Sequence, residues 1–272
     1  MTIPDVSAKS LHELVSLAGR RAVVTGGGRG LGKAIALRLA EAGADILIGD
    51  IDGTLAERAA AEIAERHDAT AVGTAMDVAD AASVAAAGEL AAARLGGIDI
   101  WVNNAGVFPS VPVAEMSVEA WDQVFAVNAR GVFLGAKEAA ARMDGGGVIV
   151  NVVSTAGFKG TAPGLAAYVG SKHAARGLTK QLALEFAPKG IRVLGVAPSF
   201  VPTEGNMAAA TAAAEAMGVQ LDPAQIAANM GTGLLGRIGV PDDIARVVLF
   251  CASDLSALMT GSTLLADAGD TI

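Results

Sequence analysis

The chain has 272 residues, 52% of them hydrophobic, and a formal net charge of −8 at pH 7. A chain of this length holds one large domain or two small ones. Its longest basic run is Arg20–Arg21, so it lacks the positive surface that nucleic-acid binding needs. No apolar run approaches the roughly 20 residues that a bilayer span requires. We therefore expect neither a nucleic-acid partner nor a membrane span.

Cysteine and histidine are too sparse for a disulfide framework or a metal centre. Cys251 is the only cysteine, which excludes an internal disulfide and is typical of a reducing compartment. We interpret it as a buried side chain on a late helix. The three histidines, His12, His67 and His173, are scattered, so we expect no metal site. The first 18 residues lack the apolar core of a secretory signal, and we predict a cytoplasmic protein.

After an N-terminal extension (1–18), strand-like and helix-like segments alternate, which predicts one catalytic domain over 19–272. The predicted strands are 21–25, 45–49, 71–76, 98–103, 147–153, 191–197 and 262–266. The predicted helices are 31–42, 54–66, 80–95, 117–143, 166–187 and 241–252. Most strands are continuous apolar runs, which is typical of parallel strands buried on both faces. The expected fold is α/β: a doubly wound, Rossmann-type parallel sheet of about seven strands with helices on both faces.

The alternation stops between Thr203 and Gly239, where two short alanine-rich helical patterns stand among glycines. A segment of this length without a strand is usually functional inside a compact domain. We interpret 203–239 as a small helical lid over a site, with a surface excursion of no function as the alternative.

The stretch "VVTGGGRGLGKAI" places glycines between the first strand and the first long helix. Gly26, Gly30 and Gly32 follow the spacing G-x-x-x-G-x-G, which differs from the commoner G-x-G-x-x-G. Glycine lets the backbone adopt positive φ and lets a ligand come close. The free N–H groups at the helix N-terminus attract a pyrophosphate. The turn therefore predicts a dinucleotide site.

The second strand ends in a residue that bears on the choice of cofactor. Asp50 stands 18 residues after Gly32, close to the separation at which a carboxylate accepts hydrogen bonds from the adenosine ribose. Such a carboxylate repels the 2′-phosphate of NADP, and the following Ile51 supplies no compensating cation. Arg29 in the glycine turn favours NADP instead. We predict NAD as the cofactor and keep NADP as the alternative.

Two more strand ends fit the same ligand. Asp77 and Val78 follow the third strand, where an adenine ring would lie. The fourth strand ends in "NNAG", Asn103 to Gly106, whose small residues leave room for a flat cofactor. Ligands bind at the carboxyl ends of the strands in a doubly wound sheet, so all of these residues are expected to lie along one edge.

The fifth strand and the helix after it carry the candidate chemistry. Tyr168 and Lys172 stand four residues apart and therefore share a helix face. An ammonium near the tyrosine, together with a cationic nicotinamide, would lower its pKa from about 10 and make it a useful base. Ser154, at the end of the strand, would hold the substrate oxygen by a hydrogen bond. The pattern predicts hydride transfer, with Tyr168 moving the proton.

These motifs together resemble the short-chain dehydrogenase/reductase family in its single-domain form, over about 20–269. The resemblance rests on "TGGGRGLG", "NNAG", "VNVVS", "YVGSK" and "GRIGVPDDIARVVLFCASD". It implies a catalytic tetrad of Asn128, Ser154, Tyr168 and Lys172, in which the asparagine holds a water of a proton relay. It also implies that Lys172 binds the nicotinamide ribose and that "APSFVPT" cradles the nicotinamide. The cofactor-binding set so predicted is Gly26, Arg29, Gly30, Leu31, Gly32, Asp50, Ile51, Asp77, Val78, Asn104, Ala105, Gly106, Tyr168, Lys172, Pro198, Val201 and Thr203.

Three features depart from the family pattern. The family serine usually precedes the tyrosine by 13 residues, whereas Ser154 precedes it by 14, so Thr155 stays an alternative. Pro198-Ser199 replaces the usual Pro-Gly, and the C-terminal end lacks the common double glycine.

The residues expected to face the substrate are apolar and predict a secondary alcohol or ketone with a hydrophobic body. They are Val107, Phe108, Phe158, Phe200 and, from the predicted lid, Met207 and Met217. The family resemblance also implies a homotetramer in which helix 117–143 and its successor pack against neighbouring copies. Three other functions stay open: a nucleotide-sugar epimerase, an NADP-dependent 3-oxoacyl-type ketoreductase, and an NAD-binding protein without turnover.

Overall fold

The sheet of this protein is entirely parallel and has seven strands in the order β3-β2-β1-β4-β5-β6-β7. The computed structural model describes residues 5–205, 207 and 233–272. The strands are β1 (Arg21–Thr25), β2 (Asp45–Asp50), β3 (Ala71–Ala75), β4 (Ile100–Asn103), β5 (Gly147–Val152), β6 (Ile191–Pro198) and β7 (Thr263–Ala266). The chain moves outward from β1 to β3 and then returns to place β4 beside β1. The strand order therefore reverses between β1 and β4, where a doubly wound sheet binds its ligand.

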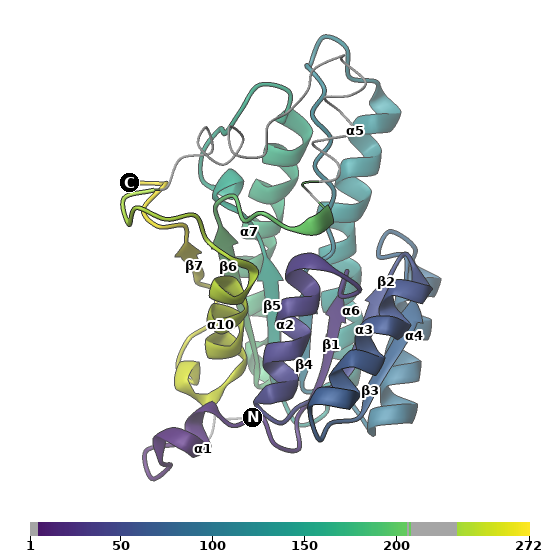
Figure 1. The fold of residues 1–272 in the computed structure, drawn as a ribbon, viewed down its shortest axis with the longest axis vertical. Helices are drawn as coiled ribbons and strands as arrows, with labels where there is room; N and C mark the ends of the chain where they lie inside the picture. The colour runs from purple at the N-terminus through teal and green to yellow at the C-terminus, as the bar shows by residue number, and fades with distance from the viewer. Residues whose placement is uncertain (1–4, 206, 208–232) are drawn as a thin grey trace.

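Helices cover both faces of the sheet (Figure 1). One layer holds α2 (Gly30–Glu41), α3 (Gly53–Arg66) and α10 (Pro241–Ala252), and the other holds α4 (Ala81–Leu95), α6 (Gly131–Arg142) and α7 (Ala166–Phe186). The short α5 (Val118–Phe125) precedes α6. The predicted doubly wound fold is confirmed, and each predicted strand agrees with an observed one to within two residues.

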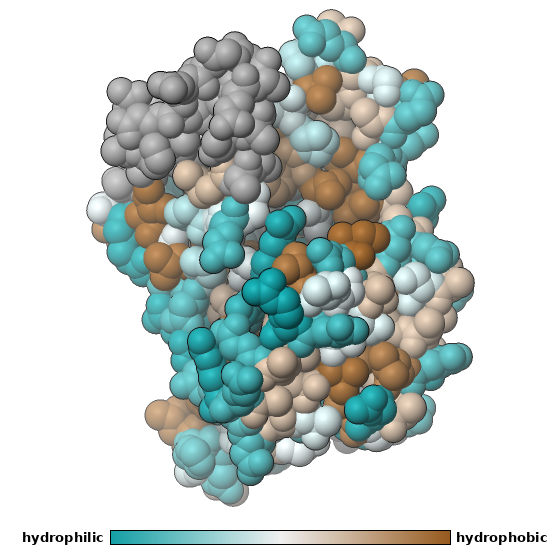
Figure 2. Space-filling model, turned by 45° about the vertical axis from the view of Figure 1, so that its right-hand side comes forward, coloured by the Kyte–Doolittle hydropathy of each residue, from teal (hydrophilic) through white to brown (hydrophobic). Residues whose placement is uncertain are grey.

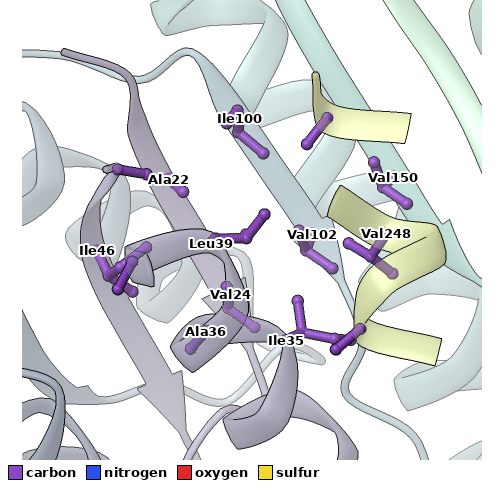
Figure 3. Packing of buried hydrophobic residues seen from close by; sticks show 14 of the residues in the cluster. Ala22, Val24, Ile35, Ala36, Leu39, Ile46, Ile100, Val102, Val150 and Val248 are labelled. Atoms are coloured by element: carbon purple, nitrogen blue, oxygen red, sulfur yellow. The ribbon is translucent and has the colours of Figure 1, made fainter. Parts of the chain in front are cut away.

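Alternate strand residues form two separate cores, one on each face. Ala22 and Val24 of β1 pack in the layer of α2 and α10, where Leu39 and Val248 meet them (Figure 3). Val23 points to the opposite face and packs in the layer of α4 and α6. All five side chains are fully buried. Burial on both faces explains why the strands are apolar runs without alternation.

The helix predicted over 117–143 is one continuous helical run from Val118 to Arg142, but a π-helical turn, η1 (Ala126–Arg130), interrupts the α-helical pattern between α5 and α6. The N-terminal extension also holds a helix that we did not predict, α1 (Leu11–Val15). Ser10 and Glu13 form a capping box at its start, and this pattern was visible in the sequence. Cys251 is buried on α10, as predicted.

Most of the predicted lid, residues 206 and 208–232, lies outside the described residues, and so does Met217. The lid stays a prediction. In the described residues that follow, the Leu234 N–H donates a backbone hydrogen bond to the carbonyl oxygen of Ala268 (2.7 Å). In the part of the chain that the structure describes, no helix has the length and apolar character needed to cross a membrane.

Candidate active site

The glycine turn joins β1 to α2 with almost no free space. Gly26 and Gly30 have φ of +63° and +56°, a conformation that side chains disfavour. A Cβ on Gly26 would lie 2.8 Å from the Cα of Ala105, and one on Gly32 would overlap the carbonyl oxygen of Gly26. Arg29, the N-cap residue of α2, makes no side-chain capping bond. The first N–H groups of α2 therefore point out of the turn without a side-chain cap from Arg29, as an anion site requires.

Asn104 locks this turn onto the next strand. Its side-chain amide donates to the carbonyl oxygens of Thr25 (2.9 Å) and Gly26 (3.0 Å). The Thr25 hydroxyl accepts hydrogen bonds from the backbone N–H groups of Asn104 and Ala105, each at 3.0 Å. These bonds tie the ends of β1 and β4 together at the point where the strand order reverses. The side chain of Asn104, a predicted cofactor-binding residue, therefore stabilises the turn.

Asp50 stands beside the turn with its carboxylate held by the backbone. Its two oxygens accept from the N–H groups of Gly28 (2.9 Å) and Asp52 (3.1 Å), and only 9% of the residue is exposed. Ile51 is 74% exposed. Arg29 is exposed as well, and it lies against Gly205 in the segment after β6.

Asp77 and Val78 follow β3 and have different environments. The Asp77 carboxylate is exposed and accepts a hydrogen bond from the N–H of Ala79 (2.9 Å). Val78 is 8% exposed and lies against Gly131 at the start of α6. Leu31, in the first turn of α2, is half-buried against the core.

Tyr168 and Lys172 lie on α7 next to the end of β5. Ser154 lies close enough to the tyrosine hydroxyl to act on its pKa, and Lys172 Nζ lies 5.8 Å from the centre of the tyrosine ring. Nζ also donates to the carbonyl oxygen of Val152 (2.9 Å). The structure brings Ser154 to the tyrosine, whereas Thr155 is buried at the start of a short 3₁₀ turn, Thr155–Gly157.

Burial sets the protonation behaviour of this pair. The ammonium of Lys172 is buried, which lowers its pKa from 10.5 to about 8. Burial raises the pKa of Tyr168, and its hydrogen bond with Ser154 acts in the opposite direction. The expected lowering of the tyrosine pKa does not hold for the protein alone. Burial raises the pKa by more than the hydrogen bond with Ser154 lowers it, because the phenolate loses its hydration.

Asn128 lies in the π-helical turn and is fully buried. Its side chain accepts from the Val107 N–H (2.9 Å) and donates to the Val107 carbonyl (2.8 Å) and to Ser171 Oγ (3.0 Å). Ser171 in turn donates to the carbonyl oxygen of Tyr168 (2.8 Å). The side chain of Asn128 therefore positions the loop after β4 and the first turn of α7. π-turns of this kind occur often at functional sites.

Two glycines keep the approach to these residues free of side chains. A Cβ on Gly106 would lie 3.3 Å from Asn128 Oδ1 and 3.6 Å from Lys172 Nζ, so the absence of a side chain keeps the approach to the lysine open. One on Gly30 would lie 3.2 Å from Thr203 Cβ, which places the Pro198–Thr203 segment over the start of α2. Asp50, the glycine turn and Lys172 could then hold the ribose, pyrophosphate and nicotinamide ends.

Among the predicted substrate residues, Phe108 contacts the candidate catalytic tyrosine. Its ring lies edge-on to Tyr168 with ring centres 6.0 Å apart and is 46% exposed. Phe158 instead lies under the guanidinium of Arg176, at 3.8 Å from the ring centre. Phe200 is 37% exposed, while Val107 and Met207 are half-buried.

Sequence reasoning missed Thr25 and Ser171, which hold the glycine turn and the start of α7 in place. It also missed the contact of Arg176 with the ring of Phe158 and the ion pair of Lys159 with Asp270 at 3.1 Å. Thr25 directly precedes the glycines and Ser171 directly precedes Lys172, so both stood inside motifs that we quoted. Arg176 and Lys159 carried no comparable signal.

Known proteins are similar to this chain along nearly its whole length. The family model described as enoyl-(acyl carrier protein) reductase matches residues 26–271. 2-(S)-hydroxypropyl-CoM dehydrogenase 3 of Xanthobacter autotrophicus is 38% identical over 250 residues, 91% of this chain and 95% of that protein. D-threitol dehydrogenase of Mycolicibacterium smegmatis is 39% identical over 259 residues, 94% of each protein.

A solved structure agrees with the same assignment. The crystal structure of a short-chain type dehydrogenase/reductase from Mycobacterium marinum superposes with a TM-score of 0.85 at 33% identity, over 96% of this chain and 99% of that one. Because the family match, the relatives and the fold all extend over almost every element from β1 to β7, the chain belongs to the short-chain dehydrogenase/reductase family.

Proposed function

We propose that this enzyme transfers a hydride between NAD(H) and a secondary alcohol or ketone, with Tyr168 as general acid and base. The contact of Tyr168 with Ser154, beside the buried ammonium of Lys172, carries the proposal. The relatives whose names describe dehydrogenases of hydroxyl-bearing compounds support the same reaction class.

The three side chains divide the proton chemistry between them. Ser154 donates a hydrogen bond to the substrate oxygen and holds it at the tyrosine hydroxyl. In reduction, Tyr168 gives its proton to that oxygen, and in oxidation the phenolate takes it back. The Lys172 ammonium stabilises the phenolate by its charge. A bound nicotinamide supplies or accepts the hydride at the substrate carbon.

We expect the cofactor to be NAD because Asp50 presents a backbone-held carboxylate at the end of β2. The exposed Arg29 supports the second candidate, an NADP-dependent ketoreductase of the 3-oxoacyl type. Titration with NADH and NADPH, followed by cofactor fluorescence, separates the two. Tighter NADH binding that is lost in Asp50→Asn supports NAD, whereas tighter NADPH binding by the unaltered protein supports the ketoreductase.

The substrate that we propose is hydrophobic, because Phe108 covers the tyrosine and Phe200 is exposed near the end of β6. A substrate panel with matched aliphatic and aromatic secondary alcohols, polyols and acyl thioesters tests this. Higher kcat/KM for the apolar alcohols is the expected result. Turnover of polyols or thioesters alone contradicts it.

We also propose that the protein is a cytoplasmic homotetramer. Exposed apolar side chains on α5, α6 and α7 support an assembly through these helices, with Val118 70%, Phe133 45% and Leu184 73% exposed. Hydrophobic residues gather in the upper half of the face in Figure 2, at the height that α5 occupies in Figure 1. Light scattering at micromolar concentration tests the assembly, and a monomer contradicts it.

The decisive experiment for the reaction is Tyr168→Phe. It keeps the ring but removes the proton that moves, so kcat should fall about 10²- to 10⁴-fold while NADH affinity is kept. His173→Gln, on the exposed side of the same helix, is the matched control and should keep full activity. An unaltered kcat in Tyr168→Phe contradicts the role of the tyrosine. Cofactor binding without turnover of any alcohol or ketone by the unaltered protein supports the non-catalytic alternative.

A further inference from the structure

Four polar side chains form a cluster in the core below the active site. Trp101 and Asn103 come from β4, Asn151 from β5 and Thr179 from α7, and they are between 0% and 4% exposed. None of them takes part in the mechanism described above. Polar groups are costly to bury, so their presence in an otherwise apolar layer calls for a reason.

The cluster is one continuous series of hydrogen bonds from the sheet to the helix. Trp101 Nε1 donates to Asn103 Oδ1 (2.9 Å), and Asn103 Nδ2 donates to Asn151 Oδ1 (2.9 Å). Asn151 Nδ2 donates to Thr179 Oγ1 (3.0 Å), which donates to the carbonyl oxygen of Ala175 on the same helix (2.9 Å). Every bond has the same donor-to-acceptor direction, an arrangement in which neighbouring hydrogen bonds strengthen one another.

The helix that receives this series carries Tyr168 and Lys172, and most of its buried side chains are small. Its buried residues are Ala167, Ser171, Lys172, Ala175, Thr179, Leu182 and Ala183. Small side chains form shallow ridges, which resist sliding along the helix axis less than large ones do. Thr179 lies seven residues after Lys172, about two turns along the same face. A hydrogen bond there demands a fixed axial position.

We propose that Thr179 is a positioning residue: the Asn103–Asn151–Thr179 series fixes the axial register of α7, so that Tyr168 meets Ser154 and Lys172 meets the Val152 carbonyl. The inference rests on the proposed catalytic roles of Tyr168 and Lys172. On this proposal, Asn103 of β4 and Asn151 of β5 affect the reaction rate because they hold α7 in place.

Two substitutions of nearly equal size separate hydrogen bonding from packing. Thr179→Val keeps the shape and removes the hydroxyl, whereas Thr179→Ser keeps the hydroxyl and removes a methyl group. We expect kcat to fall about tenfold in Thr179→Val, since small displacements of reacting groups have effects of this order or larger. Thr179→Ser should stay within about twofold of the unaltered enzyme although it leaves a small cavity. NADH affinity and thermal stability are measured on both.

A double variant guards against a simple folding defect. Thr179→Val leaves the Asn151 amide without its acceptor, which destabilises the core. Adding Asn151→Leu removes the stranded amide, while Asn103 Nδ2 loses its Asn151 acceptor and keeps the Val132 carbonyl oxygen (3.4 Å), so the double variant should recover part of the thermal stability without recovering kcat. Recovery of both, an equal loss of kcat in Thr179→Ser, or an unaltered kcat in Thr179→Val overturns the proposal. Tyr168→Phe keeps the two proposals apart: if it stays active, the catalytic assignment fails, whereas if it is inactive and both Thr179 variants behave alike, only the positioning role fails.

Discussion

The two ends of the candidate site differ in the atoms that form them: backbone atoms at one end and polar side chains at the other. At the dinucleotide end, the glycine turn and the first N–H groups of α2 form a surface of backbone atoms, and a Cβ at Gly26 would already be too close to its neighbour. At the catalytic end, α7 presents the buried polar side chains of Ser171, Lys172 and Thr179, each hydrogen-bonded to another element. We therefore expect the dinucleotide end to be impaired by substitutions that add side-chain atoms. The catalytic end should be impaired by substitutions that remove polar groups.

The largest effect is expected at the catalytic end, from Lys172→Met. Removing the ammonium takes away the charge that stabilises the phenolate, so kcat should fall about 10²-fold or more. The measurement is kcat against pH for alcohol oxidation. Full activity at high pH would show that the lysine acts only by lowering the tyrosine pKa, whereas full activity at pH 7 contradicts its role.

The same variant, Lys172→Met, should also change how the free energy of unfolding depends on pH. The pKa of Lys172 is about 8 in the folded protein and 10.5 as a free side chain, so the unfolded chain binds more protons between these values. Stability contributed by this group therefore rises as pH increases from 8 to 10.5, by about 3 kcal/mol in total. Urea unfolding of the unaltered protein should show this gain relative to Lys172→Met. Parallel stability curves for the two proteins would contradict it.

A smaller effect is expected at the dinucleotide end, from Gly32→Ala. The new Cβ would overlap the Gly26 carbonyl, and such overpacking costs about 1–3 kcal/mol, which corresponds to roughly 5- to 150-fold in NADH affinity. Gly145→Ala is the control, because no atom lies within 4 Å of its Cβ position. Equal NADH dissociation constants for the two variants would contradict the expectation that an added Cβ in the glycine turn weakens NADH binding.

The smallest effect is expected from Lys159→Met at the rim. Lys159 and Asp270 form an ion pair at 3.1 Å, with side chains 38% and 41% exposed. Exposed pairs contribute about 0–1 kcal/mol, so the thermal midpoint and kcat should barely change. A large loss of activity would show that the C-terminal residues take part in the site.

The two regions also differ in how much of them can be predicted from sequence. The glycine turn, the Asp50 carboxylate and the Tyr168–Lys172 pair are local patterns, because a turn or a helical spacing fixes their geometry within a few residues. The partners of Asn128 and Asn151 are Ser171 and Thr179, 43 and 28 residues away. No periodic pattern marks such pairs, since only the packing of η1 and β5 against α7 brings them together.

The π-helical turn at Ala126–Arg130 has a consequence for the surfaces of the two helices that it joins. One residue advances an α-helix by about 100° around its axis, so the wider turn shifts the phase of everything that follows. Before it, Trp121 and Phe125 of α5 stack on each other and pack over Gly170 of α7. After it, α6 turns Gly135 toward Trp101 and Asn103 of the sheet. A regular α-helix through this region could keep the contact of α5 with α7 or the contact of α6 with the sheet, but not both. Asn128 lies in the π-helical turn between the two helices.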